Sequence, residues 1–162
     1  MSLLLDTPVT SELRRARRPG ADRAFANWAA TTDLSRAFVS VVTIHEMERG
    51  VLLTERKDPA QGAAYRAWLE DLLEAFDGRV LGLSLGAARL AASFHVPDPA
   101  PLADALIAGT AAERGLAVVT RNTHDFGRFG VALVNPWDPT GGTATRVTGR
   151  TGRSAATGPG KP

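Results

Sequence analysis

The chain alternates short apolar runs with longer stretches of helical periodicity, and acidic residues stand where one gives way to the other. This alternation is typical of an α/β domain built on a parallel sheet, and such domains gather their ligand-binding groups at the carboxyl ends of the strands. Four acidic side chains occupy positions of this kind: Asp6, Glu46, Asp104 and Asp125. We therefore expect a central parallel sheet of four or five strands flanked by helices, with these carboxylates at one edge.

Turn and capping signals divide the chain into its elements. Apolar and β-branched runs predict strands at residues 2–6, 38–42, 79–83, 117–120 and 131–134. Four predicted helices follow residues suited to cap them: Thr7, Thr43, Asp58 and Ser84. A fifth helix is expected over residues 101–114, and we expect Asp104 and Glu46 in the first turns of their helices. Residues 121–130, with Asp125 among them, are expected to form a loop.

Length and composition indicate one domain. A chain of 162 residues with 44% hydrophobic residues can form a single core covered by helices. It contains no cysteine, which excludes disulfides and thiolate metal ligands, and no run approaches the roughly 20 apolar residues of a membrane helix. Residues 139–162 have too little apolar surface to offset the entropy cost of ordering. We predict a soluble, cytoplasmic protein with a domain at residues 1–138 and a disordered basic tail at 139–162.

The positive charge of the chain is concentrated in that tail. All 17 acidic residues lie at or before Asp138, whereas four of the 19 basic residues follow it, which leaves 15 bases and 17 acids in residues 1–138. The predicted domain is therefore slightly acidic, although the whole chain has a formal charge of +2. A polyanionic substrate would have to be held by local arginines and metal ions, because no general positive field attracts it.

A cluster of carboxylates favours a divalent metal ion, since like charges repel one another unless a cation neutralises them. If the four side chains meet, they resemble an octahedral pocket for Mg²⁺ or Mn²⁺ with positions open for phosphate. We assign Asp6, Asp104 and Asp125 as direct or water-mediated ligands. Glu46 is assigned as a ligand through water or as the group that orients an attacking water. Such a site predicts hydrolysis of a phosphodiester without a protein nucleophile.

Four sequence blocks, in order, resemble those of the PIN-domain ribonucleases: LLLDTPVTSEL, SVVTIHEMERG, PLADALIAGTAAERG and VVTRNTHDFGRFGVALVNPW. The resemblance covers nearly all of residues 1–138 and is strongest to VapC toxins of type II toxin–antitoxin pairs, in particular the FitB-like branch. It implies a PIN-like three-layer fold and a magnesium-dependent endoribonuclease whose acidic site consists of the four residues above. It also implies that the Thr120 hydroxyl supports that site by hydrogen bonding.

The same resemblance implies partners. A small antitoxin is expected to lay its C-terminal segment in the acidic groove and to place an arginine among the carboxylates, and the toxin is expected to form a homodimer. Amphipathic helices are expected to supply the walls of that groove, with four residues as candidates: Met47, Leu53, Trp68 and Leu72.

One residue departs from the family pattern. The family usually has asparagine after the LDT motif, and this chain has Pro8. Proline donates no hydrogen bond, so any bond by which that asparagine orients a carboxylate is lost. Proline is compatible with the first turn of a helix, and we therefore expect an effect on the rate of reaction and not on the fold.

Basic and polar residues near the acids are candidates for contact with the substrate. Arg121 and Asn122 lie beside Asp125 in the sequence and are expected to contact a phosphate. A second basic group follows Asp6: Arg14, Arg15, Arg17 and Arg18. These arginines could contact the RNA backbone or an acidic partner, or they could form a solvated helix end whose cations favour the helix dipole.

Two other functions fit parts of the sequence. The motif LLLDT also resembles the aspartyl-phosphate loop of haloacid-dehalogenase-type phosphatases, in which Asp6 would be the nucleophile. That chemistry normally needs a second aspartate two residues later, where this chain has Pro8. A non-enzymatic alternative is a catalytically weak PIN-fold module that binds RNA or an antitoxin in a repressor complex.

Overall fold

The computed structural model describes residues 1–16, 19–138 and the backbone of 145–146. Within these residues one sheet has the strand order β3-β2-β1-β4-β5-β6. The first five strands along this order run parallel, and β6 pairs antiparallel with β5. The strand bounds are β1 Leu3–Leu5, β2 Ala37–Ser40, β3 Val80–Leu81, β4 Ala117–Val119, β5 Ala132–Val134 and β6 Thr145–Arg146. The prediction of a parallel sheet with four or five strands is confirmed.

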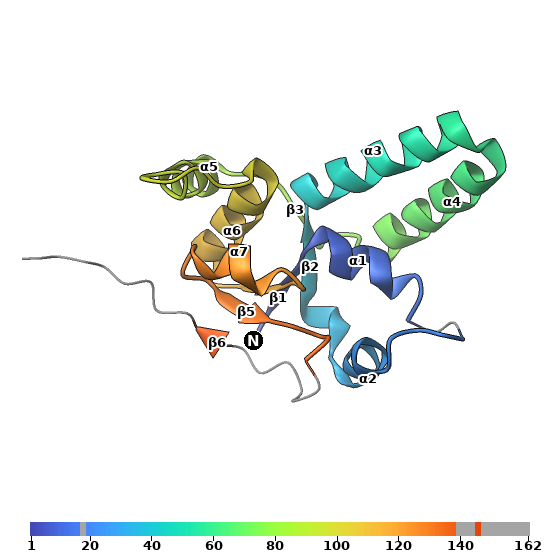
Figure 1. Cartoon of the computed structure of the whole chain (residues 1–162), viewed down its shortest axis with the longest axis horizontal. Helices are drawn as coiled ribbons and strands as arrows, with labels where there is room; N and C mark the ends of the chain where they lie inside the picture. The colour runs from blue at the N-terminus through green and yellow to red at the C-terminus, as the bar shows by residue number, and fades with distance from the viewer. Residues whose placement is uncertain (17–18, 139–144, 147–162) are drawn as a thin grey trace, which may run out of the picture.

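Helices cover both faces of the sheet (Figure 1). On one face lie α1 Thr7–Leu13, α2 Arg23–Thr31, α3 Val41–Lys57 and α4 Pro59–Ala75. On the other lie α5 Leu85–Ser93, α6 Leu102–Arg114 and α7 Thr123–Gly127. The α3–α4 pair forms a long helical hairpin that projects beyond the sheet (Figure 1). The result is the three-layer arrangement expected of a parallel sheet, whose strands are buried on both faces.

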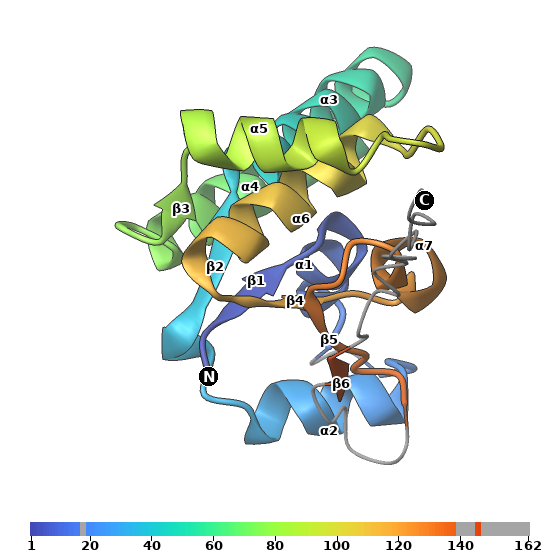
Figure 2. The same cartoon turned by 90° about the vertical axis from the view of Figure 1, so that its left-hand side faces the viewer.

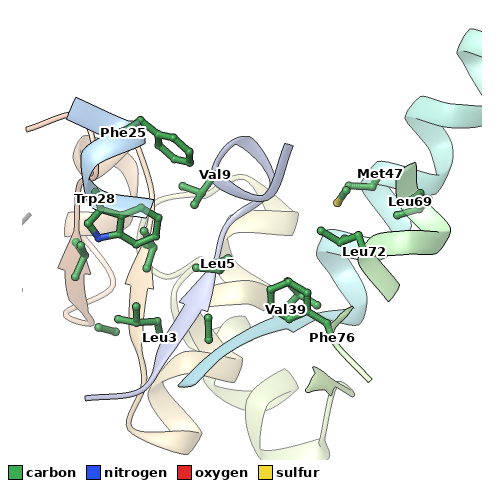
Figure 3. Close-up of a cluster of buried hydrophobic side chains, with 14 of the residues drawn as sticks. Leu3, Leu5, Val9, Phe25, Trp28, Val39, Met47, Leu69, Leu72 and Phe76 are labelled. Carbon is green, nitrogen blue, oxygen red and sulfur yellow. The ribbon is translucent and has the colours of Figure 1, made fainter. Parts of the chain in front are cut away.

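Alternate side chains of the central strands divide between the two cores. Leu3 and Leu5 of β1 pack with α1, α2, α3 and α4, whereas Leu4 between them packs with α5, α6 and α7. Figure 3 shows Leu3 and Leu5 in the first of these clusters, together with Val9 of α1 and Phe25 of α2. Both faces of these strands are buried and apolar, so a slip of one residue in the strand pairing would still leave apolar side chains in a core. The register must therefore also be held by the residues that follow each strand.

The helices α5 and α6 approach each other through small residues. A Cβ atom placed on Gly109 of α6 would lie 2.4 Å from the backbone oxygen of Ala87 in α5 and 3.1 Å from the side chain of Ala91. A separation of 2.4 Å leaves no room for a methyl group, and a backbone atom cannot swing aside as a side chain can. Glycine at this position therefore allows α6, which carries Asp104, to lie directly against α5.

Several expected boundaries were wrong by a few residues. Asp6, and not Thr7, caps α1, because its side chain accepts a hydrogen bond from the backbone of Thr7. Ser40, and not Thr43, caps α3, so the helix starts earlier than expected and Glu46 lies in its second turn. The caps at Asp58 and Ser84 are confirmed, as is Asp104 in the first turn of α6.

Two helices differ from the sequence-based expectation. The helix α2 was not predicted, although Asp22 caps it and its apolar side chains are spaced as on one helical face. Residues 121–130 are not a simple loop, since they contain α7, which Asn122 caps. Most of the predicted disordered tail at 139–162 lies outside the described residues.

No helix in the described part of the chain combines the length and apolar character needed to cross a membrane.

Candidate active site

Asp6 is the buried member of the acidic group. It directly follows β1, where its backbone N–H donates to the carbonyl of Val119 at the end of the neighbouring β4, 3.0 Å away. Its two carboxylate oxygens each accept a hydrogen bond of 2.8 Å, Oδ1 from the backbone of Thr7 and Oδ2 from the hydroxyl of Thr120. Only 4% of the residue is exposed. Burial raises the pKa of Asp6, the two hydrogen bonds lower it, and the nearby Glu46 raises it further.

Glu46 reaches the same place from α3. The residue is exposed on the second turn of that helix, and its carboxylate accepts a hydrogen bond from the hydroxyl of Thr7. Thr7 thus contacts two acids, Asp6 through its backbone and Glu46 through its side chain. Sequence reasoning did not identify Thr7 as a site residue, because its partner lies 39 residues further along the chain.

Asp125 lies on α7 and is held by Asn122. The Asn122 side-chain amide donates to the Asp125 carboxylate at 2.7 Å, and its oxygen accepts from the Asp125 backbone at 3.4 Å. The hydrogen bond from Asn122 lowers the pKa of Asp125, and His124, whose Nδ1 lies 3.0 Å from the carboxylate, lowers it further. The backbone of Asn122 also donates to the Thr120 hydroxyl at 3.0 Å. A continuous series of hydrogen bonds therefore joins Asp6 to Asp125 through Thr120 and Asn122.

Asp104 is the acid that interacts electrostatically with all of the other three. It is half-buried in the first turn of α6. Burial and then the negative charges of Asp6, Asp125 and Glu46, in that order, raise its pKa from the ordinary 3.8 to about 6. All four carboxylates predicted from the sequence are therefore close enough to interact electrostatically at one edge of the sheet. Figure 2 shows the chain running from β1 into α1 and from β4 into α7 at the same end of these two parallel strands.

The donor set suits a hard cation, although it is not a finished metal cage. Within the described ranges, no group of three or more His, Asp or Glu side chains stands in an arrangement that could hold a metal ion. Among the same residues none donates a hydrogen bond or forms an ion pair with the Asp104 carboxylate. A divalent cation bound there would offset the three charges that raise the pKa of Asp104. Carboxylate oxygens are also the ligands that Mg²⁺ and Mn²⁺ prefer.

The arginines that lie near these acids in the sequence make different contacts. The guanidinium of Arg121 lies over the ring of Trp137, 5.3 Å from its centroid, on an exposed part of the surface. Arg128 donates to the backbone oxygens of Pro99 and Asp98, at 3.0 and 2.8 Å, and so ties α7 to the loop that precedes α6. In the other predicted basic group, Arg14 lies 4.8 Å from the ring centroid of Tyr65, and residues 17–18 lie outside the described ranges.

An apolar groove of about 500 Å³ adjoins the acids. Glu46 and Ala103, the neighbour of Asp104, are among its lining residues, and its apolar walls consist of Val41, Val42, Leu83, Leu102 and Leu106. Of the two helices predicted to form its walls, α3 does line the groove and α4 does not, and none of the four side chains named for this role lines it. Met47 is buried in the core, Leu53 is exposed but does not line the groove, and Trp68 and Leu72 face a separate hollow between α1, α2 and α4.

Comparison with known proteins assigns this arrangement to a family. The PIN domain family model matches residues 3–131, which include all four acids. The chain belongs to the PIN-domain family. The resemblance seen in its sequence blocks is thereby confirmed.

Several relatives of this PIN-domain protein match it over most of their length. The VapC ribonuclease Y4jK of Sinorhizobium fredii is 32% identical over 143 residues, which are 85% of this chain and 99% of the relative. The toxin FitB of Neisseria gonorrhoeae is 32% identical over 83% of this chain and 98% of its own. A further relative, 42% identical over 71 residues, matches 44% of this chain and 66% of its own length. The crystal structure of FitAcB from Neisseria gonorrhoeae superposes with a TM-score of 0.74 at 30% identity, over 84% of this chain and 99% of that one.

Proposed function

We propose that this protein is a Mg²⁺-dependent endoribonuclease, with Mn²⁺ as a possible substitute, and that it acts in the cytoplasm as the toxin of a toxin–antitoxin pair. The observation that carries the proposal is the convergence of three carboxylates on Asp104, whose pKa is raised to about 6 by burial first and then by their negative charges. An unneutralised cluster of this kind is destabilising in itself and is explained by a function that needs a cation. Relatives named as a VapC ribonuclease and as the toxin FitB support RNA as the substrate.

Each acid has a role that follows from its surroundings. Asp6, Asp104 and Asp125 would hold the metal directly or through water. Of these, Asp6 and Asp125 are oriented in advance by hydrogen bonds from Thr120 and Asn122. When bound, Mg²⁺ supplies charge neutralisation at the phosphate and lowers the pKa of water. Glu46, exposed at the edge of the site, would orient the attacking water.

Arg121 is the candidate for contact with the RNA backbone. Its guanidinium is exposed and stacked on Trp137, which limits its freedom and leaves its N–H groups available for a phosphate. Asn122 was predicted to share this role, but both polar atoms of its side chain are engaged with Asp125. We therefore assign Asn122 to the orientation of Asp125.

The phosphatase alternative is less well supported. Both oxygens of the Asp6 carboxylate accept hydrogen bonds. This suits a fixed metal ligand better than a nucleophile that must approach phosphorus. The proline at position 8 also removes the acid that this chemistry would need two residues after Asp6.

An antitoxin is the proposed protein partner. The neighbouring FitAcB structure at 30% identity supports this assignment. The apolar groove beside Glu46 and Ala103 would receive an apolar segment of that antitoxin, and a basic side chain at the end of the segment would reach the carboxylates. Occupation of this groove would block access of RNA to the site.

The direct test is cleavage of total bacterial RNA by the purified protein. We expect fragments to form with Mg²⁺, to disappear with excess EDTA, and to return when Mn²⁺ is added in excess of the chelator. Digestion under EDTA would contradict the proposed chemistry. Metal binding without cleavage of any RNA would favour the binding module, and a radiolabelled phosphoenzyme trapped on Asp6 would favour the phosphatase.

We also propose a homodimer. Large apolar side chains that do not line the groove remain exposed on α3 and α5: Leu52, Leu53, Leu85 and Leu90. Exposed apolar surface of this kind marks interaction sites. Light scattering on the purified protein is expected to give twice the chain mass of 17.1 kDa. A double substitution of Leu85 and Leu90 by serine is expected to shift the mass toward that of one chain, and a monomeric wild-type protein would contradict the proposal.

A further inference from the structure

Thr7 connects two acids that belong to different elements. Its backbone N–H donates to Asp6 Oδ1 at 2.8 Å, and its hydroxyl donates to the carboxylate of Glu46. No other side chain in the described residues donates a hydrogen bond to Glu46. Thr7 is the first residue of α1, whereas Glu46 lies on α3, so this hydroxyl forms a polar link between the two helices beside the site.

The physical need for such a link comes from the exposure of Glu46. The side chain stands on the outer part of α3, where a glutamate would ordinarily sample many rotamers in water. Ordering a long side chain of this type has an appreciable entropy cost. Glu48 and Glu55 of the same helix pair with Arg66 of α4, and these ion pairs do not include Glu46. The position of the Glu46 carboxylate near Asp6 and Asp104 therefore depends on a specific hydrogen bond. Thr7 provides this hydrogen bond, and the backbone of Thr7 is itself held by its hydrogen bond to Asp6.

We propose that Thr7 is a positioning residue, which holds the Glu46 carboxylate toward the metal site through its hydroxyl. The effect of Thr7 on catalysis rests on the proposed function. Its effect on the position of Glu46 rests on geometry alone. Thr7→Val removes the hydroxyl and keeps the shape and the backbone hydrogen bond to Asp6. Thr7→Ser keeps the hydroxyl and is the matched conservative variant.

The structural arm of the test uses the metal-free protein and does not depend on catalysis. Side-chain ¹³C relaxation by NMR reports the order of the Glu46 methylene groups. We expect the same restricted motion in wild type and Thr7→Ser, and clearly greater motion in Thr7→Val, with similar melting temperatures for all three. Equal motion of Glu46 in the three proteins would overturn the proposal, whatever their activity.

The functional arm measures Mn²⁺ binding by electron paramagnetic resonance and the kinetics of RNA cleavage. Removal of groups that support metal ligands typically costs 10–100-fold in metal affinity or activity. We expect Thr7→Val to lower kcat or Mn²⁺ affinity by about tenfold, with KM for RNA nearly unchanged, and Thr7→Ser to recover most of the loss. If wild type neither binds Mn²⁺ nor cleaves RNA, the proposed function fails, and the NMR result still decides the role of Thr7.

A double-mutant cycle identifies the route of the effect. If Thr7 acts through Glu46, Thr7→Val should add little to the loss caused by Glu46→Gln. Full additivity of the two losses would overturn the proposal, because it would mean that Thr7 acts independently of Glu46. Thr31→Val is the control for loss of a threonine hydroxyl. Thr31 donates to the Asn27 carbonyl within α2 and lines a different cavity, so its replacement should leave Mn²⁺ binding unchanged.

Discussion

Asp104→Asn is expected to abolish most RNA cleavage while making the protein more stable. Loss of activity should exceed about 100-fold, because even residues that only support a metal ligand account for 10–100-fold, and Asp104 is proposed to hold the metal directly or through water. Expression of wild type in a bacterial host should arrest growth, and expression of the variant should not. Growth arrest by both proteins would contradict the proposed role of Asp104.

The gain in stability follows from the raised pKa of Asp104. In the folded, metal-free protein this pKa is about 6, against an ordinary value of 3.8. Above pH 6 the carboxylate is ionised in both folded and unfolded states, and the folded state bears the cost of burial and repulsion. As the pH falls from 6 to about 4, the folded state takes up a proton first and this cost disappears. The wild-type protein should therefore gain stability from this group on acidification through that range.

Thermal denaturation in EDTA checks this prediction. The melting temperature of Asp104→Asn should exceed that of wild type above pH 6, and the difference should shrink toward pH 4. Asp77→Asn is the control, since Asp77 is an exposed aspartate in the turn between α4 and β3, and it should show no such pH-dependent gain. A variant of Asp104 that melts below wild type at pH 7.5 would mean that the charge is not destabilising there.

Gly109→Ala is expected to destabilise the fold, although alanine is ordinarily the better helix former. The added methyl group would lie 2.4 Å from the backbone oxygen of Ala87, so α5 and α6 must separate. Overpacking of this kind typically costs about 1–3 kcal/mol, which outweighs the roughly 1 kcal/mol that alanine gains over glycine in a helix. Urea denaturation should therefore show a net loss of up to about 2 kcal/mol, and Gly109→Val a larger one.

Gly127→Ala is the matched control in a helix. A Cβ atom on Gly127 meets nothing within 4 Å, so its free energy of unfolding should stay unchanged or rise by about 0.4–1 kcal/mol. If Gly109→Ala were as stable as wild type, the close approach of α5 and α6 would not hold in solution. In that case the contact between these helices could not be what places Asp104 beside the other acids.

The positions of the acids were more predictable from the sequence than the positions of the residues that hold them by hydrogen bonds. Asp6 could be placed because it follows an apolar strand, and Asp104 because Pro101 and Gly115 mark the ends of its helix. The hydroxyl of Thr7 could not be placed, since a hydrogen bond to a residue in another helix leaves no local pattern. The helix α7 was missed because five residues are too few for a periodic signal.

Burial on the α3–α4 hairpin was equally hard to assign from the sequence. Met47 and Leu53 lie on the same helix, and both are apolar, but one is in the core and the other is exposed. The difference arises because the hairpin extends past the sheet (Figure 1), which leaves part of its apolar surface without a covering layer. Only the tertiary arrangement decides which of these side chains is covered.

The strand order has a consequence for the newly made polypeptide. Of the strands in the described residues, β1 is made first and lies in the middle of the sheet, and its neighbour β4 is made more than one hundred residues later. Asp6 obtains the Thr120 hydroxyl as a partner only when that late strand has joined. A nascent chain that stops before residue 117 would therefore lack a complete set of acids, and the proposed chemistry would require β4 and α7 to have been made and joined to the sheet.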